Sequence, residues 1–127
     1  MARLIDYSTA PRVERGDGIE SVPLTSDPLD GQPFVMGTTS FPPDTAIRLH
    51  SHNCVEQVTV VEGEAIVELD GRRHTARPWD TTQVAAGEVH RFINPGPGVL
   101  RILWVYGALE VTRTFPDTGQ TVPQFDR

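Results

Sequence analysis

Glycine or proline interrupts most stretches of this sequence that are long enough for a helix, and no stretch shows sustained helical periodicity. The chain has 11 glycines and 11 prolines among its 127 residues. Glycine readily adopts the φ values that turns need, and proline cannot donate a backbone hydrogen bond, so both tend to end regular elements. Short runs rich in β-branched and aromatic residues lie between them. The sequence therefore predicts an all-β sandwich or barrel with little or no helix.

The expected strands follow one another between residues 34 and 114. Asp70-Gly71 is a strong hairpin signal, because a type I′ turn needs a positive φ at both central residues. Gly63 and the Pro-Gly-Pro-Gly run at residues 95–98 mark two further chain reversals. We expect strands at residues 34–41, 45–50, 55–61, 64–70, 72–77, 81–85, 89–93, 99–106 and 109–114.

Length and charge favour one small soluble domain. A chain of 127 residues can enclose one hydrophobic core, and its net charge of −6 comes without any run of lysine or arginine. Nucleic acid and anionic membranes are therefore poor partners, because both require a basic patch. The chain has no apolar stretch of membrane-spanning length and no apolar signal region at its start. We expect a cytoplasmic protein, and Cys54 as the single cysteine fits a reducing compartment.

Two histidines and a glutamate lie within seven positions of one another. His50 and His52 are separated by one residue, so on a strand they share a face with Cα atoms about 6.6 Å apart. Both imidazoles can reach one metal ion from that spacing. Glu56 follows a short turn and can return to them from the next strand. By itself, this pattern fits either a metal site or a polar exposed strand that happens to carry two histidines.

A second group of residues complements the first. Gly87, His90 and Asn94 follow the spacing G-x-x-H-x-x-x-N, while the first group reads H-x-H, then glutamate after three residues and Gly63 after six more. Together they resemble the two motifs of the cupin superfamily, and the match covers roughly residues 34–114. The chain resembles a small single-domain (RmlC-like) cupin.

The resemblance implies a cupin-type double-stranded β-helix, or jelly-roll barrel, at residues 34–114. Residues 1–33 are then an N-terminal arm or edge strands that could contact a second subunit, and residues 115–127 are a C-terminal tail. The resemblance also implies a homodimer, since an open barrel leaves edge strands that need cover.

Three positions depart from the family pattern. Asp44 and Trp79 stand where each motif usually opens with glycine, and Ala85 stands where the second motif usually has proline. All three are expected at turns or strand ends. They put the local loop shape in doubt but leave the expected metal ligands intact.

The resemblance implies a bound metal, with His50, His52, Glu56 and His90 as its ligands. Three imidazoles and one carboxylate suit divalent Fe, Mn, Co, Ni, Cu or Zn and do not select among them. Four protein ligands on an octahedral ion leave two positions for water, oxygen or substrate, whereas four on tetrahedral zinc close the site. The choice between catalysis and a purely structural or binding role depends on this coordination.

Two further residues are candidates for the chemistry. Arg48 shares the expected face of His50 and could hold a substrate carboxylate through its guanidinium fork; alternatively it pairs with an acid at the barrel mouth. Tyr106 could act as an acid–base hydroxyl, although the pattern of residues 99–106 does not show which face points inward.

Three residues with polar or reactive side chains have plainer expected roles. Free cysteine usually packs as a small hydrophobe. On alternation and position, we expect an outward-facing Gln57, a partly buried Cys54 near the turn, and a solvated His74.

The leading functional hypothesis is a metal-dependent enzyme acting on a small oxygen- or carboxylate-bearing molecule, with the metal as Lewis acid or oxygen-activating centre. Dioxygenase-like chemistry and non-redox isomerase or lyase chemistry both fit, and we lean toward the first. The alternatives are a non-catalytic binding or sensory cupin and a cupin whose metal only stabilises the barrel. The fold does not decide among them.

Overall fold

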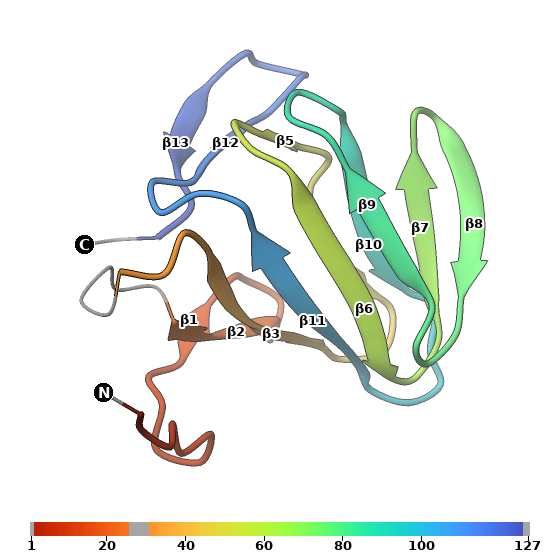
Figure 1. Ribbon diagram of the computed structural model, residues 1–127. Helices are drawn as coiled ribbons and strands as arrows, with labels where there is room; N and C mark the ends of the chain where they lie inside the picture. The colour runs from red at the N-terminus through yellow and green to blue at the C-terminus, as the bar shows by residue number, and fades with distance from the viewer. Residues whose placement is uncertain (1, 26–30, 126–127) are drawn as a thin grey trace.

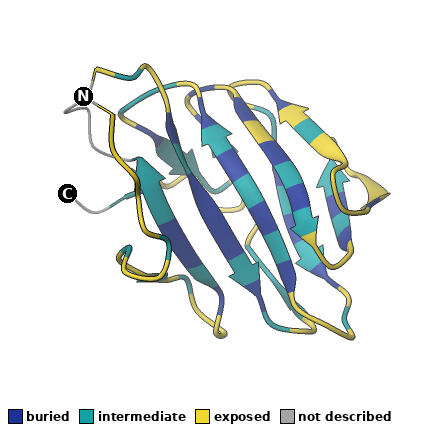
Figure 2. Cartoon of the chain, turned by 60° about the horizontal axis from the view of Figure 1, so that its bottom comes forward, coloured by how far each residue is buried: buried dark blue, intermediate teal, exposed yellow. Residues whose placement is uncertain are grey.

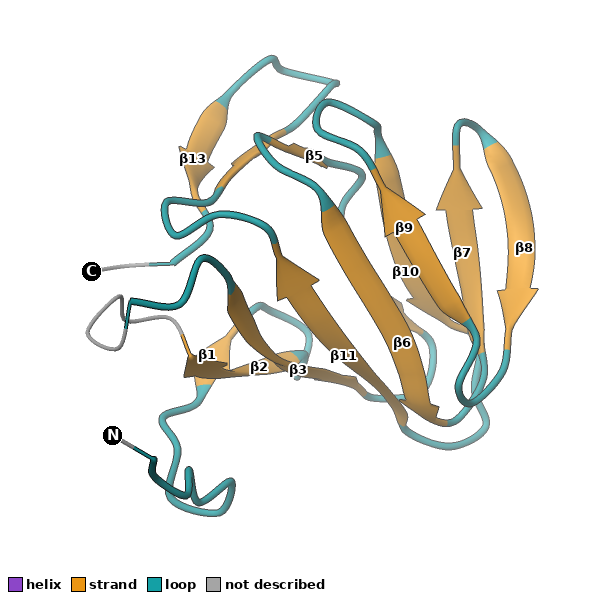
Figure 3. Cartoon of the chain, in the orientation of Figure 1, coloured by secondary structure: helices purple, strands orange, loops and turns teal. Residues whose placement is uncertain are grey.

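The chain folds into strands joined by turns and loops (Figures 1 and 3). The structure is a computed structural model that describes residues 2–25 and 31–125. This part of the chain contains 13 β-strands and no helix, which confirms the prediction of an all-β fold. Within it, no helix is long and apolar enough to cross a membrane. Residues 1, 26–30 and 126–127, which belong to the expected arm and tail, lie outside the described residues.

Three antiparallel sheets make up the described part of the chain. The six-stranded sheet has the order β1-β2-β3-β11-β6-β9, the four-stranded sheet β4-β10-β7-β8, and the three-stranded sheet β13-β12-β5. The strands of the first sheet are Val13–Glu14, Glu20–Thr25, Val35–Phe41, Leu100–Tyr106, Glu56–Glu62 and Thr81–Val84 in that spatial order. Those of the second are Thr45–Ala46, His90–Asn94, Ala65–Leu69 and Arg72–Ala76, and those of the third are Thr121–Pro123, Thr112–Thr114 and Ser51–His52.

The core lies between the two larger sheets, and strand alternation sorts side chains into it. Figure 2 shows buried and less buried residues alternating along the central strands. On β11 every second residue from Leu100 to Tyr106 is buried, which identifies the inward face that the sequence pattern left open. On β10 the inward residues are His90, Phe92 and Asn94. One hydrophobic cluster contains side chains from both sheets. The core therefore holds in place β6 and β10, the strands that carry Glu56 and His90.

Two tight turns behave as the sequence predicts. Asp70 and Gly71 both have positive φ, 52° and 77°, which matches the predicted type I′ hairpin between β7 and β8. Gly63 has a φ of 80°, and a Cβ added there would lie 2.3 Å from the carbonyl oxygen of Val99. Glycine is therefore required at residue 63 by both backbone conformation and space.

The three departures from the family pattern have local explanations. Asp44 and Trp79 adopt positive φ values of 62° and 77°, so each takes the conformation for which glycine is the usual residue. The backbone N–H of Ala85 donates a hydrogen bond to the carboxylate of Glu88 at 2.7 Å. Proline could not make this bond, because it has no N–H. The loops thus keep their shape with different residues.

The predicted strand at residues 45–50 is wrong as a continuous element. Strand β4 ends at Ala46, and the chain then moves from one sheet to another. The backbone of His50 still bridges to His90, with N–H···O distances of 2.9 and 3.2 Å. The next two residues form β5, which pairs with β12 in the third sheet. A strand that changes partner cannot keep one continuous ladder.

The predicted strand at residues 109–114 begins only at Thr112. The side chain of Asn53 donates to the carbonyl of Glu110 and accepts from the N–H of Thr112, at 2.9 Å each. Such side-chain bonds satisfy backbone groups that a strand ladder would otherwise use.

The ends of the chain add edge strands to the sheets. Strand β2 pairs with β3 in the six-stranded sheet, and β1 pairs with β2 at the edge of that sheet. At the other end of the chain, β13 pairs with β12. A contact between residues 1–33 and a second subunit stays a prediction.

Candidate metal centre

Three buried histidines meet where the sheets come together. His50 lies at the bridge to β10, His52 on β5 and His90 at the start of β10. Their exposed fractions are 6%, 5% and 1%. The ring centroids are 4.5 to 5.3 Å apart, and one ring nitrogen of each lies within 4.8 Å of the others. The alternation predicted for His50 and His52 therefore places both in one buried group, and His90 joins them.

A backbone carbonyl orients each imidazole through its Nδ1 atom. A carbonyl oxygen only accepts hydrogen bonds, so Nδ1 must carry the proton, and a neutral imidazole then leaves its Nε2 lone pair unprotonated. Metal-binding histidines are commonly held in this way, with the remaining ring nitrogen directed at the ion. In the order His50, His52 and His90, the carbonyl partners are Arg48 at 2.7 Å, Thr112 at 3.0 Å and Glu88 at 3.0 Å.

Burial keeps two of the imidazoles neutral. Burial, followed by the charges of the neighbouring histidines, lowers the pKa of His50 to about 4 and that of His52 to about 3. The charges of Arg113 and Arg15 also act to lower the pKa of His50. Neutral imidazole is the form that binds metal, because protonation occupies the lone pair. These histidines are therefore ready to bind a cation at neutral pH.

Glu56 faces the histidines from β6. Its Oε1 lies 3.0 Å from Nε2 of His90 and 3.7 Å from Nε2 of His52, and the residue is 4% exposed. A carboxylate oxygen and an imidazole lone pair are both acceptors, so a contact at 3.0 Å needs a cation between them. Burial acts to lower the pKa of His90, but the hydrogen bond and charge of Glu56 outweigh it and raise that pKa. A proton or a metal ion can satisfy this pair.

The donor set fits a divalent transition metal. Three ring nitrogens converge, two imidazoles are held neutral, and an adjacent carboxylate can balance part of the ion's charge. The three histidines can hold an ion as a group, whereas Glu56 as a fourth ligand stays a prediction.

Asn94, the last residue of the second motif, has a structural role. It is 1% exposed, and its Nδ2 lies 2.9 to 3.1 Å from the carbonyl oxygens of Phe41, Pro42 and Gly98. Its Oδ1 accepts from the N–H of Gly96 at 2.8 Å. The side chain thus ties two loops together at the far end of β10 from His90.

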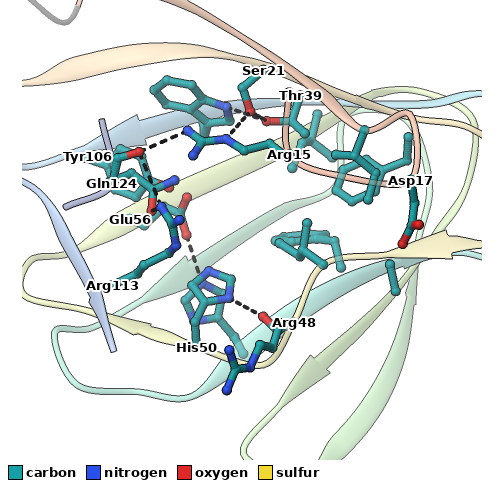
Figure 4. A pocket seen from close by; sticks show the side chains of 18 of the residues that line it. Arg15, Asp17, Ser21, Thr39, Arg48, His50, Glu56, Tyr106, Arg113 and Gln124 are labelled. Atoms are coloured by element: carbon teal, nitrogen blue, oxygen red, sulfur yellow. Dashed lines mark hydrogen bonds and ion pairs between the residues drawn. The ribbon is translucent and has the colours of Figure 1, made fainter. Parts of the chain in front are cut away.

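His50 and His90 face a cavity of about 360 Å³ (Figure 4). This volume lies at the lower end of the range for small-molecule sites. His50, His90 and Glu56 form part of its wall. Aromatic and aliphatic residues also line it: Phe41, Phe92, Trp104, Tyr106, Ile47 and Ile102. A small molecule in the cavity would therefore contact an apolar wall and the metal-binding group together.

Tyr106 lies beside the metal-binding group. Its hydroxyl is 3.5 Å from Nε2 of His52, at the limit of a hydrogen bond. Burial and the charge of Glu56 raise the pKa of Tyr106 well above its ordinary value. The phenol is therefore protonated at neutral pH and can donate a hydrogen bond.

Arg48 lines the same cavity as His50, but its charge is already engaged. Its guanidinium forms an ion pair with Asp117 at 2.6 Å and stacks over the ring of Phe115, 4.0 Å from the centroid. Both side chains of the ion pair are exposed, by 46% and 64%. This geometry matches an arginine paired with an acid, and a substrate contact by Arg48 stays a prediction.

The expected roles of the three other polar or reactive residues are confirmed. Gln57 is exposed and donates to the side chain of Gln83 at 2.7 Å. Cys54 belongs to the hydrophobic cluster, and burial, followed by the charge of Glu56, raises its pKa. His74 is exposed on β8.

Sequence reasoning missed several residues of the cavity wall, among them three from the two ends of the chain. Arg15, Arg113 and Gln124 all line the cavity, although they come from the two ends of the chain. Arg15 follows β1 and Arg113 lies on β12. They belong to no motif, and no local spacing relates them to the histidines, so the sequence offered no signal for them.

A family model described as a cupin domain matches residues 37–106, which is more than half of the chain. The chain belongs to the cupin family. The resemblance inferred from the two motifs is thereby confirmed. No curated protein sequence matches this cupin.

Solved structures show the same fold. A predicted oxalate decarboxylase from Thermotoga maritima superposes with a TM-score of 0.74 at 21% identity, over 84% of this chain and 99% of that one. The polyketide cyclase RemF from Streptomyces resistomycificus gives 0.75 at 21% identity, over 100% and 88%. KdgF from a Halomonas species gives 0.70 at 18% identity, over 84% and 94%. The all-β jelly-roll fold is confirmed, and identities this low support the fold alone.

Proposed function

We propose that this cupin is a metal-dependent enzyme that acts on a small oxygen- or carboxylate-bearing organic molecule. The observation that carries the proposal is the orientation of His50, His52 and His90 by backbone carbonyls, with His50 and His90 in the wall of the cavity. These residues, with Glu56, would hold a divalent Fe, Mn, Co, Ni, Cu or Zn ion. Such an ion supplies Lewis acidity and, if redox-active, access to oxygen chemistry.

The chain's own residues perform three tasks in this proposal. The aromatic and aliphatic part of the wall would displace water next to a bound substrate, which would strengthen electrostatic interactions there. Glu56 balances positive charge next to the histidines. The raised pKa of Tyr106 keeps its hydroxyl protonated near Nε2 of His52, so that this hydroxyl can donate a hydrogen bond to a substrate oxygen.

We propose dioxygenase-like chemistry ahead of isomerase or lyase chemistry. The test is to load the protein anaerobically with Fe(II), add a panel of small hydroxy and keto acids, and measure oxygen uptake. We expect uptake that depends on the substrate and is lost in His50→Ala, while the exposed His74→Ala behaves as wild type.

If no oxygen uptake occurs with Fe(II) or with any of the other candidate metals, the proposal of dioxygenase-like chemistry is wrong. The same mixtures analysed by NMR for substrate conversion then test the isomerase or lyase version. If no conversion occurs and X-ray absorption shows a four-coordinate zinc site without water, the non-catalytic binding or sensory role replaces the enzyme.

We also propose a cytoplasmic homodimer in which residues 1–33 cover a sheet edge. The support is that β1, the strand at the edge of the six-stranded sheet, is two residues long and covers little of that edge. An uncovered sheet edge can pair with another chain. Light scattering coupled to size exclusion should give twice the chain mass at micromolar concentration, and a monomer there would contradict the proposal.

A further inference from the structure

A pair of buried hydroxyl groups lies in the wall of the cavity. Ser21 on β2 and Thr39 on β3 are directly opposite each other in the antiparallel ladder, and their exposed fractions are 3% and 7%. Residues opposite each other in a ladder project to the same face of the sheet, so both hydroxyls point inward. Both residues line the cavity that also contains His50 and Glu56. Figure 4 shows the pair on the opposite side of the cavity from His50.

Each hydroxyl oxygen already accepts a hydrogen bond from a nitrogen. Nε1 of Trp104 donates to Oγ1 of Thr39 at 2.9 Å, and Nε of Arg15 donates to Oγ of Ser21 at 3.3 Å. Both of these nitrogens can only donate. The two hydroxyl oxygens are 2.8 Å apart, so one hydroxyl donates to the other. Among the described residues, the two hydroxyls make these three hydrogen bonds.

One of the two hydroxyl hydrogens is left over, whichever way the pair is oriented. If Ser21 donates to Thr39, the hydrogen of Thr39 has no acceptor in the part of the chain that the structure describes. If Thr39 donates to Ser21, the same holds for the hydrogen of Ser21. A buried donor without an acceptor costs free energy. Because both residues line the cavity, the pair offers this one donor to a molecule inside it.

We propose that Ser21 and Thr39 form a hydrogen-bond-donor subsite that binds a carbonyl oxygen of the substrate, at the end remote from the histidines. The inference rests on the proposed function, because it places the substrate between the metal centre and the hydroxyl pair. It narrows the substrate class to small molecules with oxygen at both ends. An apolar wall discriminates weakly between molecules of the same shape, whereas a buried donor rejects a molecule that lacks the acceptor.

The test compares molecules that differ only in the acceptor oxygen. The probes are levulinate, its two homologues with one and two further methylene groups between the carboxylate and the ketone, and the analogue of each in which a methylene group replaces the ketone oxygen. Calorimetry on protein loaded with Ni(II) gives the dissociation constants. We expect at least one ketone to bind about fivefold or more tightly than its methylene analogue, which corresponds to one hydrogen bond.

Variants of the pair test the source of this ketone preference. Ser21→Ala/Thr39→Val removes both hydroxyls and should abolish the preference, whereas Thr39→Ser keeps both and should retain it. Ser21→Ala and Thr39→Val alone each leave one hydroxyl, whose hydrogen is released from the pair, so at least one of them should keep the preference. Thr59→Val/Thr81→Val is the matched control and should bind as wild type, because it removes an exposed hydroxyl pair, 2.8 Å apart, on β6 and β9.

The inference is overturned if wild type binds every ketone no more tightly than its methylene analogue, or if no ketone binds. It is also overturned if the double variant keeps the preference. The variant Thr39→Val leaves the indole N–H of Trp104 without its acceptor, so circular dichroism checks folding. If the double variant does not fold, the addition of Trp104→Phe removes this N–H as well. The preference is a ratio within each variant, so a general change in the cavity cancels.

Metal content separates this inference from the proposed function. Each variant should retain the wild-type metal stoichiometry, so that a lost preference belongs to the hydroxyl pair. If wild type takes up metal but shows no ketone preference, the subsite fails and the proposed enzyme stands. If wild type takes up no metal, the proposed enzyme fails. Cyclohexanone and methylenecyclohexane then test the subsite in metal-free protein, with the indole N–H signal of Trp104 as the NMR readout.

Discussion

At the scale of single residues, the site depends on hydrogen bonds that fix which nitrogen of each histidine carries the proton. The carbonyl partners of His50, His52 and His90 come from two different neighbourhoods. Those of His50 and His90 lie two residues earlier in the chain, at Arg48 and Glu88, while that of His52 is supplied by β12. Local backbone geometry thus orients two rings, and tertiary pairing orients the third.

The protonated nitrogen can be observed directly. In metal-free protein at neutral pH, ¹⁵N NMR should show His50 and His52 as neutral imidazoles with the proton on Nδ1, because a carbonyl accepts from that atom and burial lowers the pKa of each ring. Adding a diamagnetic metal such as Zn(II) should shift the Nε2 signals and leave the Nδ1–H bonds in place. The exposed His74 is the control and should be unaffected. Protonation on Nε2 of His50 or His52 would contradict the site.

A second residue-scale prediction concerns Trp79. Its φ of 77° is unfavourable for any residue with a side chain, and the indole is 75% exposed, so little packing would be lost on truncation. Trp79→Gly should be more stable than Trp79→Ala by about 1 kcal/mol, because only glycine relieves the left-handed conformation. Urea unfolding measures the difference. Equal stability of the two variants would show that the turn is not strained.

At the scale of elements, tight reversals and cross-strand pairs decide how the sheets are held. Gly63 lets the turn between β6 and β7 pass close to the backbone at Val99. On the outer face of the four-stranded sheet, Glu68 on β7 pairs with Arg91 on β10 and with Arg73 on β8, at 3.0 and 2.9 Å. One carboxylate therefore connects three neighbouring strands.

The two hairpin glycines should respond differently to alanine. Both have positive φ, but a Cβ at Gly63 would lie 2.3 Å from a backbone oxygen, whereas at Gly71 it would meet open space. Gly71→Ala should cost about 1 kcal/mol of unfolding free energy from the backbone conformation alone. Gly63→Ala should cost at least about 2 kcal/mol more, because backbone atoms must move. Chemical denaturation of both variants would show this order, and a reversed order would refute it.

The Glu68 pairs predict a pH dependence. The hydrogen bond and charge of Arg91, with help from Arg73, lower the pKa of Glu68 in the folded protein. Its contribution is therefore present above the unfolded pKa of a glutamate and is lost as the pH falls through the lower folded value. Glu68→Gln should cost up to about 1 kcal/mol at pH 7, as expected for cross-strand ion pairs. The difference from wild type should shrink below about pH 4 in urea titrations; a difference that persists at pH 3 would rule out the charge.

At the scale of the whole molecule, the metal-binding group connects separate sheets. His90 belongs to the four-stranded sheet, His52 to the three-stranded sheet, and Glu56 to the six-stranded sheet. An ion bound by these side chains would link all three. Its binding energy should therefore appear in global stability as well as in local order.

Metal addition should raise the melting temperature of the whole chain. At a free metal concentration about one hundred times the dissociation constant, the stabilisation should be about 2.7 kcal/mol. His90→Ala should remove most of this shift, and His74→Ala should keep it. Calorimetry with and without a chelator makes the comparison. Collapse of His90→Ala without metal, relative to metal-free wild type, would instead mean that the histidine is needed for the apo fold.

The grouping of His90 and Glu56 with His50 and His52 was predicted from the resemblance to the two cupin motifs. Local patterns in the chain were sufficient for the strand content, the hairpin at Asp70-Gly71 and the shared face of His50 and His52. These features depend on alternation and turn chemistry, which act over a few residues and leave a readable spacing. The break after Ala46 and the late start of β12 were not readable in this way, because they depend on where each segment finds its partner. The positions of Arg15, Arg113 and Asp117 in the structure are the clearest case. Arg15 and Arg113 are brought to the cavity, and Asp117 to Arg48, by strands or loops far away in sequence. Folding alone could therefore bring cations from both ends of the chain to one wall.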